Sequence, residues 1–222
     1  MRLKKNYREF QKIIKERKIT ELIHFTPTKN LLSILEQGEI MSRARLESLG
    51  IEYIQFNDKI RYDDKNYINL SLSGPNTFLL KKYKKRYEND PTITWCILKV
   101  DPKHIYEYDT LFSVTNAARR LNISGDLEKF KQLFLPEIKY GTRVIKRGNI
   151  KDKYPTDEQA EILVKDSIPL SSIMKVCFYN EEDLACTRAA IAMSTIQKTT
   201  SLDSIISNFI IDPEIFNPNR GL

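Results

Sequence analysis

The stretch YPTDEQAEILV, residues 154–164, joins a polar turn to an apolar run. The run from Ala160 to Val164 predicts a β-strand. Glu161 stands in that run at a position where a core strand normally carries isoleucine or valine. Because an unpaired buried carboxylate costs several kcal/mol, we expect Glu161 to face a solvent-filled cleft or to meet a cation, as catalytic carboxylates do. The alternative is a glutamate on the wet face of an edge strand.

Two basic segments precede this stretch. The first, KKYKKR at residues 81–86, predicts the solvated face of a helix or a phosphate contact. The second spans residues 139–153 and holds a single acid, Asp152, among its basic side chains. Its basic residues are Lys139, Arg143, Lys146, Arg147, Lys151 and Lys153. Because this segment contains two glycines and lacks helical periodicity, it predicts a flexible basic loop that meets an anionic substrate.

Composition describes one compact domain. The 222 residues carry a formal net charge of +7, and the basic excess belongs to the first 180 residues because the remainder holds three basic and six acidic side chains. No apolar stretch approaches the ~20 residues that cross a bilayer, and the charged opening lacks a secretory signal, so we expect a cytoplasmic protein with no membrane contact. Cys96, Cys177 and Cys186 lack metal-ligand spacing and only two histidines occur, which favours core cysteines and no metal.

Periodicity and capping residues predict the order of elements. Helices are expected over residues 7–17, 29–37, 77–87, 126–134 and 202–210. Strands are expected over residues 22–25, 67–73, 92–100, 160–164 and 173–179. Pro213 and Pro218 predict an extended tail. Since these elements mix without a regular βαβ repeat, the fold class is α+β rather than doubly wound.

His24 lies near the end of the first predicted strand, in ITELIHFT at residues 19–26. Taken alone, it fits a core imidazole hydrogen-bonded to the backbone. It is followed by Asn30-Leu31 and by a helix whose stop position is Gly38. A strand-borne histidine, an Asn-Leu pair and a helix that ends in glycine resemble the opening of the DarT family of DNA ADP-ribosyltransferases.

Further segments resemble the same family, in order, over roughly residues 19–179. They are Asn57-Asp58 with Arg61, INLSLSGPN at 68–76, WCILKVDP at 95–102, Phe112, TNAA at 115–118 and QAE at 159–161. The first two are similar to the arginine and the Ser/Pro/Asn turn of the guanine-modifying branch. The sequence departs from the family at Gly74, where a bulkier residue is expected, and at Glu39-Ile40, where a short apolar pair is expected.

The resemblance implies an ADP-ribosyltransferase-like split β-sandwich with flanking helices. A single domain would span residues 1–222, with a core over about 19–180 and a helical extension over about 181–222. The co-substrate would be NAD, without a metal. Cleavage of the nicotinamide bond leaves an oxocarbenium-like ribose, and a carboxylate beside that sugar stabilises charge that develops only in the transition state.

The resemblance also assigns roles to residues. Glu161 would be the catalytic carboxylate, and Arg61 would act in catalysis or hold the NAD phosphates, unless it forms an ordinary ion pair with a neighbouring aspartate. The expected NAD contacts are His24, Phe25, Thr26, Asn30, Gly38 and Arg61. The expected substrate contacts are Asn76, Asn116, Arg143, Lys146, Arg147 and Tyr154. Asn76 fits a helix cap equally well, and Tyr140 or Tyr154 would stack on an extruded base.

Three functions remain open at this point. The first is mono-ADP-ribosylation of a base in single-stranded DNA, guanine or else thymine, by the toxin of a toxin–antitoxin pair whose macrodomain-containing antitoxin removes the mark. The second keeps the fold and changes the acceptor to RNA, protein or water. The third is a non-catalytic nucleic-acid-binding module. Basic residues cannot separate DNA from RNA, since phosphate contacts carry no base identity.

Overall fold

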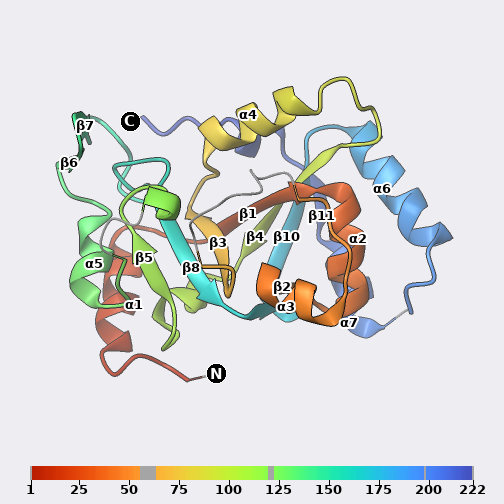
Figure 1. The fold of residues 1–222 in the computed structure, drawn as a ribbon, viewed down its shortest axis with the longest axis horizontal. Helices are drawn as coiled ribbons and strands as arrows, with labels where there is room; N and C mark the ends of the chain where they lie inside the picture. Colours follow the sequence, from red (N-terminus) through yellow and green to blue (C-terminus); the bar gives the residue numbers. More distant parts are fainter. Residues whose placement is uncertain (1, 56–63, 120–122, 198, 222) are drawn as a thin grey trace.

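A seven-stranded sheet forms the centre of the molecule in the computed structural model, which describes residues 2–55, 64–119, 123–197 and 199–221 (Figure 1). Its strand order is β11-β10-β4-β1-β3-β8-β5. The strands are β1 (Leu22–Pro27), β3 (Tyr67–Leu72), β4 (Trp95–Val100), β5 (Leu111–Ser113), β8 (Glu161–Lys165), β10 (Ile173–Phe178) and β11 (Phe209–Ile211). Neighbouring strands are antiparallel except β10 and β11. This arrangement confirms the α+β class.

Among the described residues, the α-helices include the five that the sequence predicted and two that it did not, over residues 43–49 and 181–193. They are α1 (Tyr7–Glu16), α2 (Thr28–Gln37), α3 (Arg43–Leu49), α4 (Thr77–Arg86), α5 (Leu127–Gln132), α6 (Glu181–Met193) and α7 (Thr200–Ser207). Asn76 Oδ1 accepts a hydrogen bond from Leu79 N and caps α4, as predicted. Gly38 ends α2 at a φ of 77°, a left-handed conformation that glycine adopts without a Cβ penalty.

The sheet is covered on both faces. Along β4, Leu98 and Val100 point into the larger core, with α1, α2, α5, α6 and α7, whereas Trp95 and Ile97 point into a smaller core with α4. This alternation is the period-2 pattern of a strand that is buried on both sides. Each such buried side chain contributes roughly 1.5–3 kcal/mol.

The sheet forks between β1 and β3. These strands pair only at Leu22↔Leu72 and Ile23↔Ser71, while β1 continues beside β4 as far as Pro27 and β3 pairs with β8 from Tyr67 to Leu70. Beyond Ile23 the two strands therefore diverge, and the sheet divides into a β4-side half and a β8-side half.

Two small sheets flank the large one. β2 (Glu39–Met41) pairs with β9 (Ser167–Pro169), and β6 (Glu137–Tyr140) pairs with β7 (Arg143–Lys146). The prediction of a flexible loop over residues 139–153 is therefore wrong for its first half, which is a β-hairpin. Short strands with exposed basic residues were mistaken for a loop because a four-residue strand leaves little periodicity to detect.

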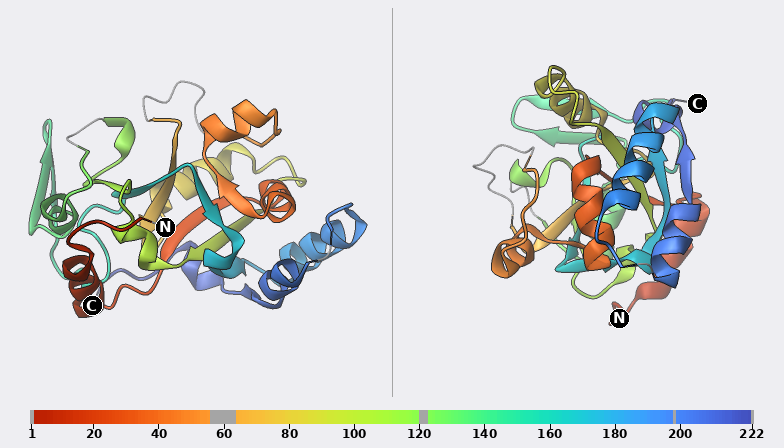
Figure 2. Two further views of the ribbon diagram at one scale, coloured as in Figure 1. Left: turned by 90° about the horizontal axis from the view of Figure 1, so that it is seen from below. Right: turned by 90° about the vertical axis from the view of Figure 1, so that its right-hand side faces the viewer.

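The predicted helix over residues 202–210 is wrong at its end. It stops at Ser207, and Phe209–Ile211 becomes β11, which runs parallel to β10. Short apolar runs do not distinguish helix from strand, which explains the error. The following turn of 3₁₀ helix, η4 (Pro213–Phe216), packs Ile215 and Phe216 into the smaller core where an extended tail was predicted. α6 and α7 lie at the opposite end of the molecule from the β6–β7 hairpin (Figures 1 and 2).

Within the described ranges, no helix is long and apolar enough to cross a membrane. Cys96 and Cys177 are buried as predicted. Cys186 is exposed on α6, so the prediction of a core cysteine is wrong there. α6 has little apolar periodicity, with Leu184 and Thr187 as its buried residues, and the sequence pattern does not reveal which side faces the core.

Candidate active site

A cleft opens at the fork of the sheet and holds about 1110 Å³ of empty space, counting solvent at its mouth. One wall comes from β1, α2 and the residues after α3, and the other from β3, the start of α4 and β8. Among the expected site residues, those that line the cleft are His24, Phe25, Thr26, Asn30, Asn76 and Glu161. The histidine of the first strand and the candidate acid therefore share one cleft.

Glu161 begins β8 and is 5% exposed. Ile162 and Val164 belong to the larger core, so strand alternation turns Glu161 to the opposite face of the sheet. Its Oε2 accepts a hydrogen bond from the backbone N–H of Ala117, at 2.6 Å. A charged acceptor on a backbone donor makes a short, strong hydrogen bond, which fixes the direction of the carboxylate.

The Ala117 donor is presented by the turn after β5. Asn116 Oδ1 accepts from Ala118 N at 3.0 Å, and Asn116 O accepts from Arg119 N at 3.0 Å. Asn116 does not stand among the described residues that line the cleft. The structure places it in the turn on which Glu161 depends, where its side chain and its carbonyl accept from Ala118 N and Arg119 N.

His24 connects the two strands at the fork. Its Nδ1 lies 3.3 Å from the carbonyl oxygen of Asn69 on β3. Because a carbonyl only accepts, Nδ1 carries the proton, and the neutral ring keeps Nε2 as an acceptor. Burial lowers the pKa of His24, with a smaller opposite effect from the Asn69 hydrogen bond. The ring is therefore neutral at pH 7.

Asn30 fixes the loop that borders the β1 side of the cleft. Its Nδ2 donates to Ile54 O at 3.0 Å and to Thr26 Oγ1 at 3.2 Å, and its Oδ1 accepts from Ile54 N at 2.7 Å. Both amide protons are thus engaged within the protein. The side chain acts on the cleft by holding Ile54, together with its lining neighbours Tyr53 and Gln55.

The other expected NAD contacts differ in position. Phe25 lines the cleft and also packs in the smaller core, with its ring centroid 6.1 Å from that of Trp95. Gly38 does not stand among the described residues that line the cleft, although its neighbours Gln37 and Glu39 do. Arg61 and the Asn57-Asp58 pair lie outside the described residues.

Two amide groups meet the cleft with unused donors. The Nδ2 atoms of Asn69 and Asn76 are buried and make no hydrogen bond among the described residues. Asn76 Oδ1 is held by Leu79 N at 3.0 Å, so its NH₂ group must be the free end. Buried donors without partners cost about 1–3 kcal/mol each, and a ligand acceptor would remove that cost. Sequence reasoning missed Asn69, whose signal was a polar residue in the alternation of β3.

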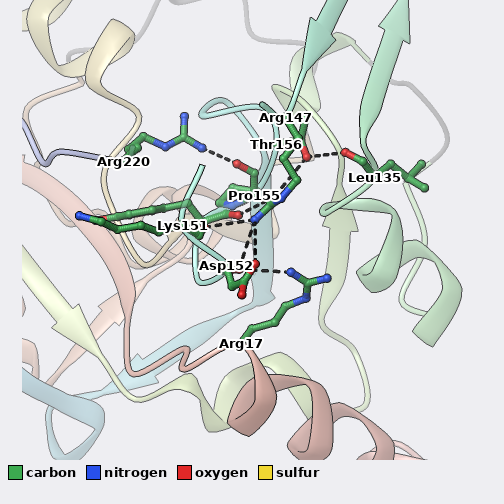
Figure 3. Close-up of polar contacts among 9 residues, drawn as sticks. Arg17, Leu135, Arg147, Lys151, Asp152, Pro155, Thr156 and Arg220 are labelled. Atoms are coloured by element: carbon green, nitrogen blue, oxygen red, sulfur yellow. Dashed lines mark hydrogen bonds and ion pairs between the residues drawn. The ribbon is translucent and has the colours of Figure 1, made fainter. Parts of the chain in front are cut away.

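The basic segment divides into exposed and structural cations. Arg143 and Lys146 are exposed on β7 and remain able to meet a phosphate. The guanidinium of Arg147 instead donates to Tyr154 O at 3.0 Å and to Lys151 O at 3.1 Å (Figure 3). The proposed substrate contact of Arg147 is therefore not supported, because its donors satisfy the carbonyls of an irregular loop.

Tyr154 is 4% exposed and packs beneath the turn that follows β3. Its burial leaves no ring face for a stacked base, so its expected substrate role is not supported either. The same packing explains the departure at Gly74, since a Cβ there would lie 2.8 Å from Tyr154 Cε1. At the other departure, Glu39 forms an ion pair with Arg45, and Ile40 is buried in the larger core. Tyr140 is 9% exposed, with Arg119 4.6 Å from its ring centroid.

The four described ranges contain no cluster of three or more His, Cys, Asp or Glu side chains that could hold a metal ion. The groups that line the cleft include the carboxylate of Glu161, the neutral imidazole of His24 and several amide donors, together with Glu39, which pairs with Arg45. Such a set can stabilise a developing positive charge and bind polar groups of a ligand.

Comparison with known proteins places the fold. The family model described as "DarT: ssDNA thymidine ADP-ribosyltransferase" matches residues 23–209. A Thermosipho africanus chain, described as DarTG in complex with ADP-ribose, superposes with a TM-score of 0.58 at 20% identity over 89% of this chain and 51% of that chain. Thermus sp. 2.9 DarT in complex with NAD⁺ superposes with a TM-score of 0.57 at 13% identity, over 88% of this chain and 96% of that one.

The Thermus protein in complex with ADP-ribosylated single-stranded DNA gives a TM-score of 0.50 at 11% identity. This chain thus spans about half the length of the Thermosipho chain and nearly all of the Thermus chain. No curated protein matches it in sequence. At these identities the structures establish a shared fold, which confirms the split, ADP-ribosyltransferase-like architecture predicted from the sequence.

Proposed function

The chain belongs to the DarT family of single-stranded-DNA ADP-ribosyltransferases, and from that premise we propose that it transfers ADP-ribose from NAD to a base of single-stranded DNA, with Glu161 as the catalytic carboxylate. The observation that carries the proposal is the position of Glu161 in the cleft at the fork, held by Ala117 N opposite the wall that bears His24.

The reaction breaks the bond between the nicotinamide nitrogen and C1″ of the ribose and forms a bond between C1″ and a nitrogen of the base. The base nitrogen loses its proton to the carboxylate of Glu161 or to solvent, and nicotinamide leaves with the electron pair of the broken bond. Positive charge grows on the ribose before the new bond forms. A carboxylate held in a partly dehydrated cleft stabilises that charge more strongly than water does.

The neutral ring of His24 would contribute differently. Since Nδ1–H is directed at Asn69 O, Nε2 can accept a hydrogen bond from a ribose hydroxyl and orient the sugar. Thr26, Phe25 and the Tyr53–Gln55 loop held by Asn30 would complete the NAD wall. Arg61 would add a fixed positive charge for the phosphates or the base.

Guanine is the favoured acceptor, with thymine as the alternative. Guanine carries two adjacent acceptors, O6 and N7, on one edge, whereas thymine offers O4 and O2 on either side of an N–H donor. Two unused amide donors, on Asn69 and Asn76, suit the guanine edge better. The exposed cations Arg143 and Lys146 would hold the phosphates of the strand.

One assay tests the reaction and the acceptor together. Labelled NAD is incubated with the protein and with short single-stranded DNA oligomers that contain guanine or thymine as the only variable base, and an RNA oligomer of the guanine sequence serves as a control. Transfer to the guanine DNA supports the proposal. Transfer to the thymine DNA alone would show that the acceptor base is thymine and not guanine. Label on RNA alone, or release of nicotinamide without transfer, would overturn the DNA assignment.

A toxin role extends the same proposal to the cell. The similar Thermosipho chain is described as DarTG, and it is about twice as long as this chain. We expect induced expression in a bacterial host to stop growth, the Glu161→Gln variant to be harmless, and a co-expressed macrodomain hydrolase to restore growth by removing the mark. Growth arrest that persists in the Glu161→Gln variant would contradict a toxin that acts through transfer.

A further inference from the structure

Residues 217–221 run back across the loop that leads to Glu161. Ile150 and Gly221 form an antiparallel bridge, and Lys151 N donates to Arg220 O at 2.8 Å. The Lys151 ammonium also donates to Asn219 O at 3.1 Å. We call this segment the strap. Its backbone is thus tied to residues 150–151, about ten positions before the catalytic acid.

The guanidinium of Arg220 is the side-chain contact of the strap with this loop. Its Nη2 donates to the carbonyl of Pro155 (Figure 3). Its Cζ lies 5.4 Å from the centroid of the Tyr154 ring, and Asp157 and Glu158 attract its charge. A partly buried cation costs desolvation energy, and an arginine that binds one carbonyl and one ring face offsets that cost through its planar fork.

The residues that Arg220 contacts open the stretch that ends in Glu161. After Pro155, Thr156 N donates to Leu133 O at 2.8 Å, and Ala160 N donates to Asp157 O at 3.1 Å. Gln159 N donates to Asp157 Oδ1 at 2.9 Å. The backbone between the arginine and the acid is therefore a short turn that is held at Thr156, Gln159 and Ala160.

A second branch reaches the other side of the cleft. Glu158 Oε2 accepts from Thr77 Oγ1 at 2.6 Å, at the first turn of α4 and next to Asn76. The loop held by Arg220 thus contacts both Glu161, which follows it in the chain, and the first turn of α4 beside the cap residue Asn76. By contrast, the hydrogen bonds of His24 and Asn30 go to Asn69, Thr26 and Ile54, none of which belongs to residues 217–221.

We infer that Arg220 is a positioning residue for Glu161: the strap locks the loop before the acid and so controls turnover, without forming part of the NAD wall. This inference rests on the proposed transfer reaction and adds to it a residue outside the cleft that affects the rate of turnover. A displacement of about 1 Å in a catalytic group can cost on the order of 100-fold in rate. Loss of Arg220 is therefore expected to lower kcat by 10- to 100-fold and to leave the KM for NAD within about twofold.

The test uses the full chain with Arg220→Ala, Arg220→Lys and, as a matched control, Arg188→Gln, which removes an exposed guanidinium from α6. Each variant is assayed for transfer to single-stranded DNA with NAD varied, and its melting temperature is recorded. We expect Arg220→Ala to lose kcat, Arg220→Lys to keep part of it by donating to Pro155 O, and Arg188→Gln to match the parent. Millimolar guanidinium chloride, which can enter the space left by the side chain, should restore part of the kcat of Arg220→Ala.

The outcomes separate the two proposals. No transfer by the parent chain would remove the proposed function itself. Parent activity with an unchanged kcat in Arg220→Ala would overturn the positioning role. A change in KM without a change in kcat would also overturn the positioning role. The same holds for a loss of kcat that accompanies a lower melting temperature and that guanidinium does not relieve. A variant that stops after Asn217 removes the carbonyls of the strap as well and should lose at least as much kcat as Arg220→Ala.

Discussion

The two walls of the cleft are built in opposite ways. The His24 wall comes from one nearly continuous segment, residues 22–55, in which Asn30 hydrogen-bonds to Thr26 and Ile54. The Glu161 wall brings together the turn at Ala117, the loop that Arg147 holds and the strap. The loop that borders the His24 wall is held within its own segment, although β1 itself pairs with the distant β4 and β3, whereas the Glu161 wall depends on distant segments throughout.

Glu161→Gln should remove the negative charge of the Glu161 wall and leave the structure of that wall intact. Glutamine keeps an oxygen to accept from Ala117 N, so the turn stays in place while the negative charge is lost. We expect transfer to fall by about 10³-fold, the order found when a group that stabilises transition-state charge is removed. Single-turnover assays with labelled NAD measure this loss.

Glu137→Gln supplies the matched control, because Glu137 lies on the β6–β7 hairpin and pairs only with the nearby Lys139 among its described ion pairs. Its transfer rate should equal that of the parent. A Glu161→Gln variant that retains more than a tenth of the parent activity would show that the carboxylate is not the centre of the reaction.

This contrast explains what the sequence could and could not reveal. The resemblance grouped His24, Thr26 and Asn30 as expected NAD contacts, and all three line the cleft. Glu161 was identifiable because an acid in an apolar strand is costly without a purpose. Arg147 and Tyr154 were expected to meet the substrate, but the structure engages Arg147 within the protein and buries Tyr154, because charge and aromaticity in a predicted loop indicate structure as readily as they indicate a ligand. Nothing in the local pattern shows that Arg147 meets the carbonyls of Lys151 and Tyr154.

Asn30→Ala should weaken the first wall. The substitution leaves Ile54 N and Ile54 O without their partner and frees the loop that borders the cleft. We expect the KM for NAD to rise about tenfold with a smaller change in kcat, and the free energy of unfolding to fall by about 1–3 kcal/mol. NAD titrations of transfer and urea unfolding provide the two measurements.

Asn30→Asp sharpens that result. The aspartate can still accept from Ile54 N, but it cannot donate to Ile54 O or to Thr26 Oγ1. Its KM should lie between those of the parent and Asn30→Ala. Equal KM values for all three proteins would show that the loop does not contact NAD.

Gly74→Ala should strain the second wall from outside. The new Cβ would lie 2.8 Å from Tyr154 Cε1 and 3.3 Å from Pro218 Cγ, so the ring above the strap must move. Overpacking of this kind typically costs about 1–3 kcal/mol. Urea unfolding should show that loss, and the double variant Gly74→Ala with Tyr154→Leu should be less destabilised than the sum of the two single variants. Strict additivity would mean that the alanine does not meet the ring.

The smallest predicted effect is a pH dependence of the free energy of unfolding, and it arises from His24 on the first wall. Because burial lowers the pKa of His24 below its ordinary 6.5, the unfolded chain binds more protons than the folded chain as the pH falls through 6.5. The contribution of a neutral His24 to stability is therefore complete above that pH and declines below it, by at most about 1.4 kcal/mol per pH unit. Urea unfolding of the parent and of His24→Gln between pH 5 and pH 7.5 measures this decline as the difference between the two proteins. The parent should lose stability faster than the variant below pH 6.5, and a difference that stays constant with pH would mean that folding does not lower the pKa of His24.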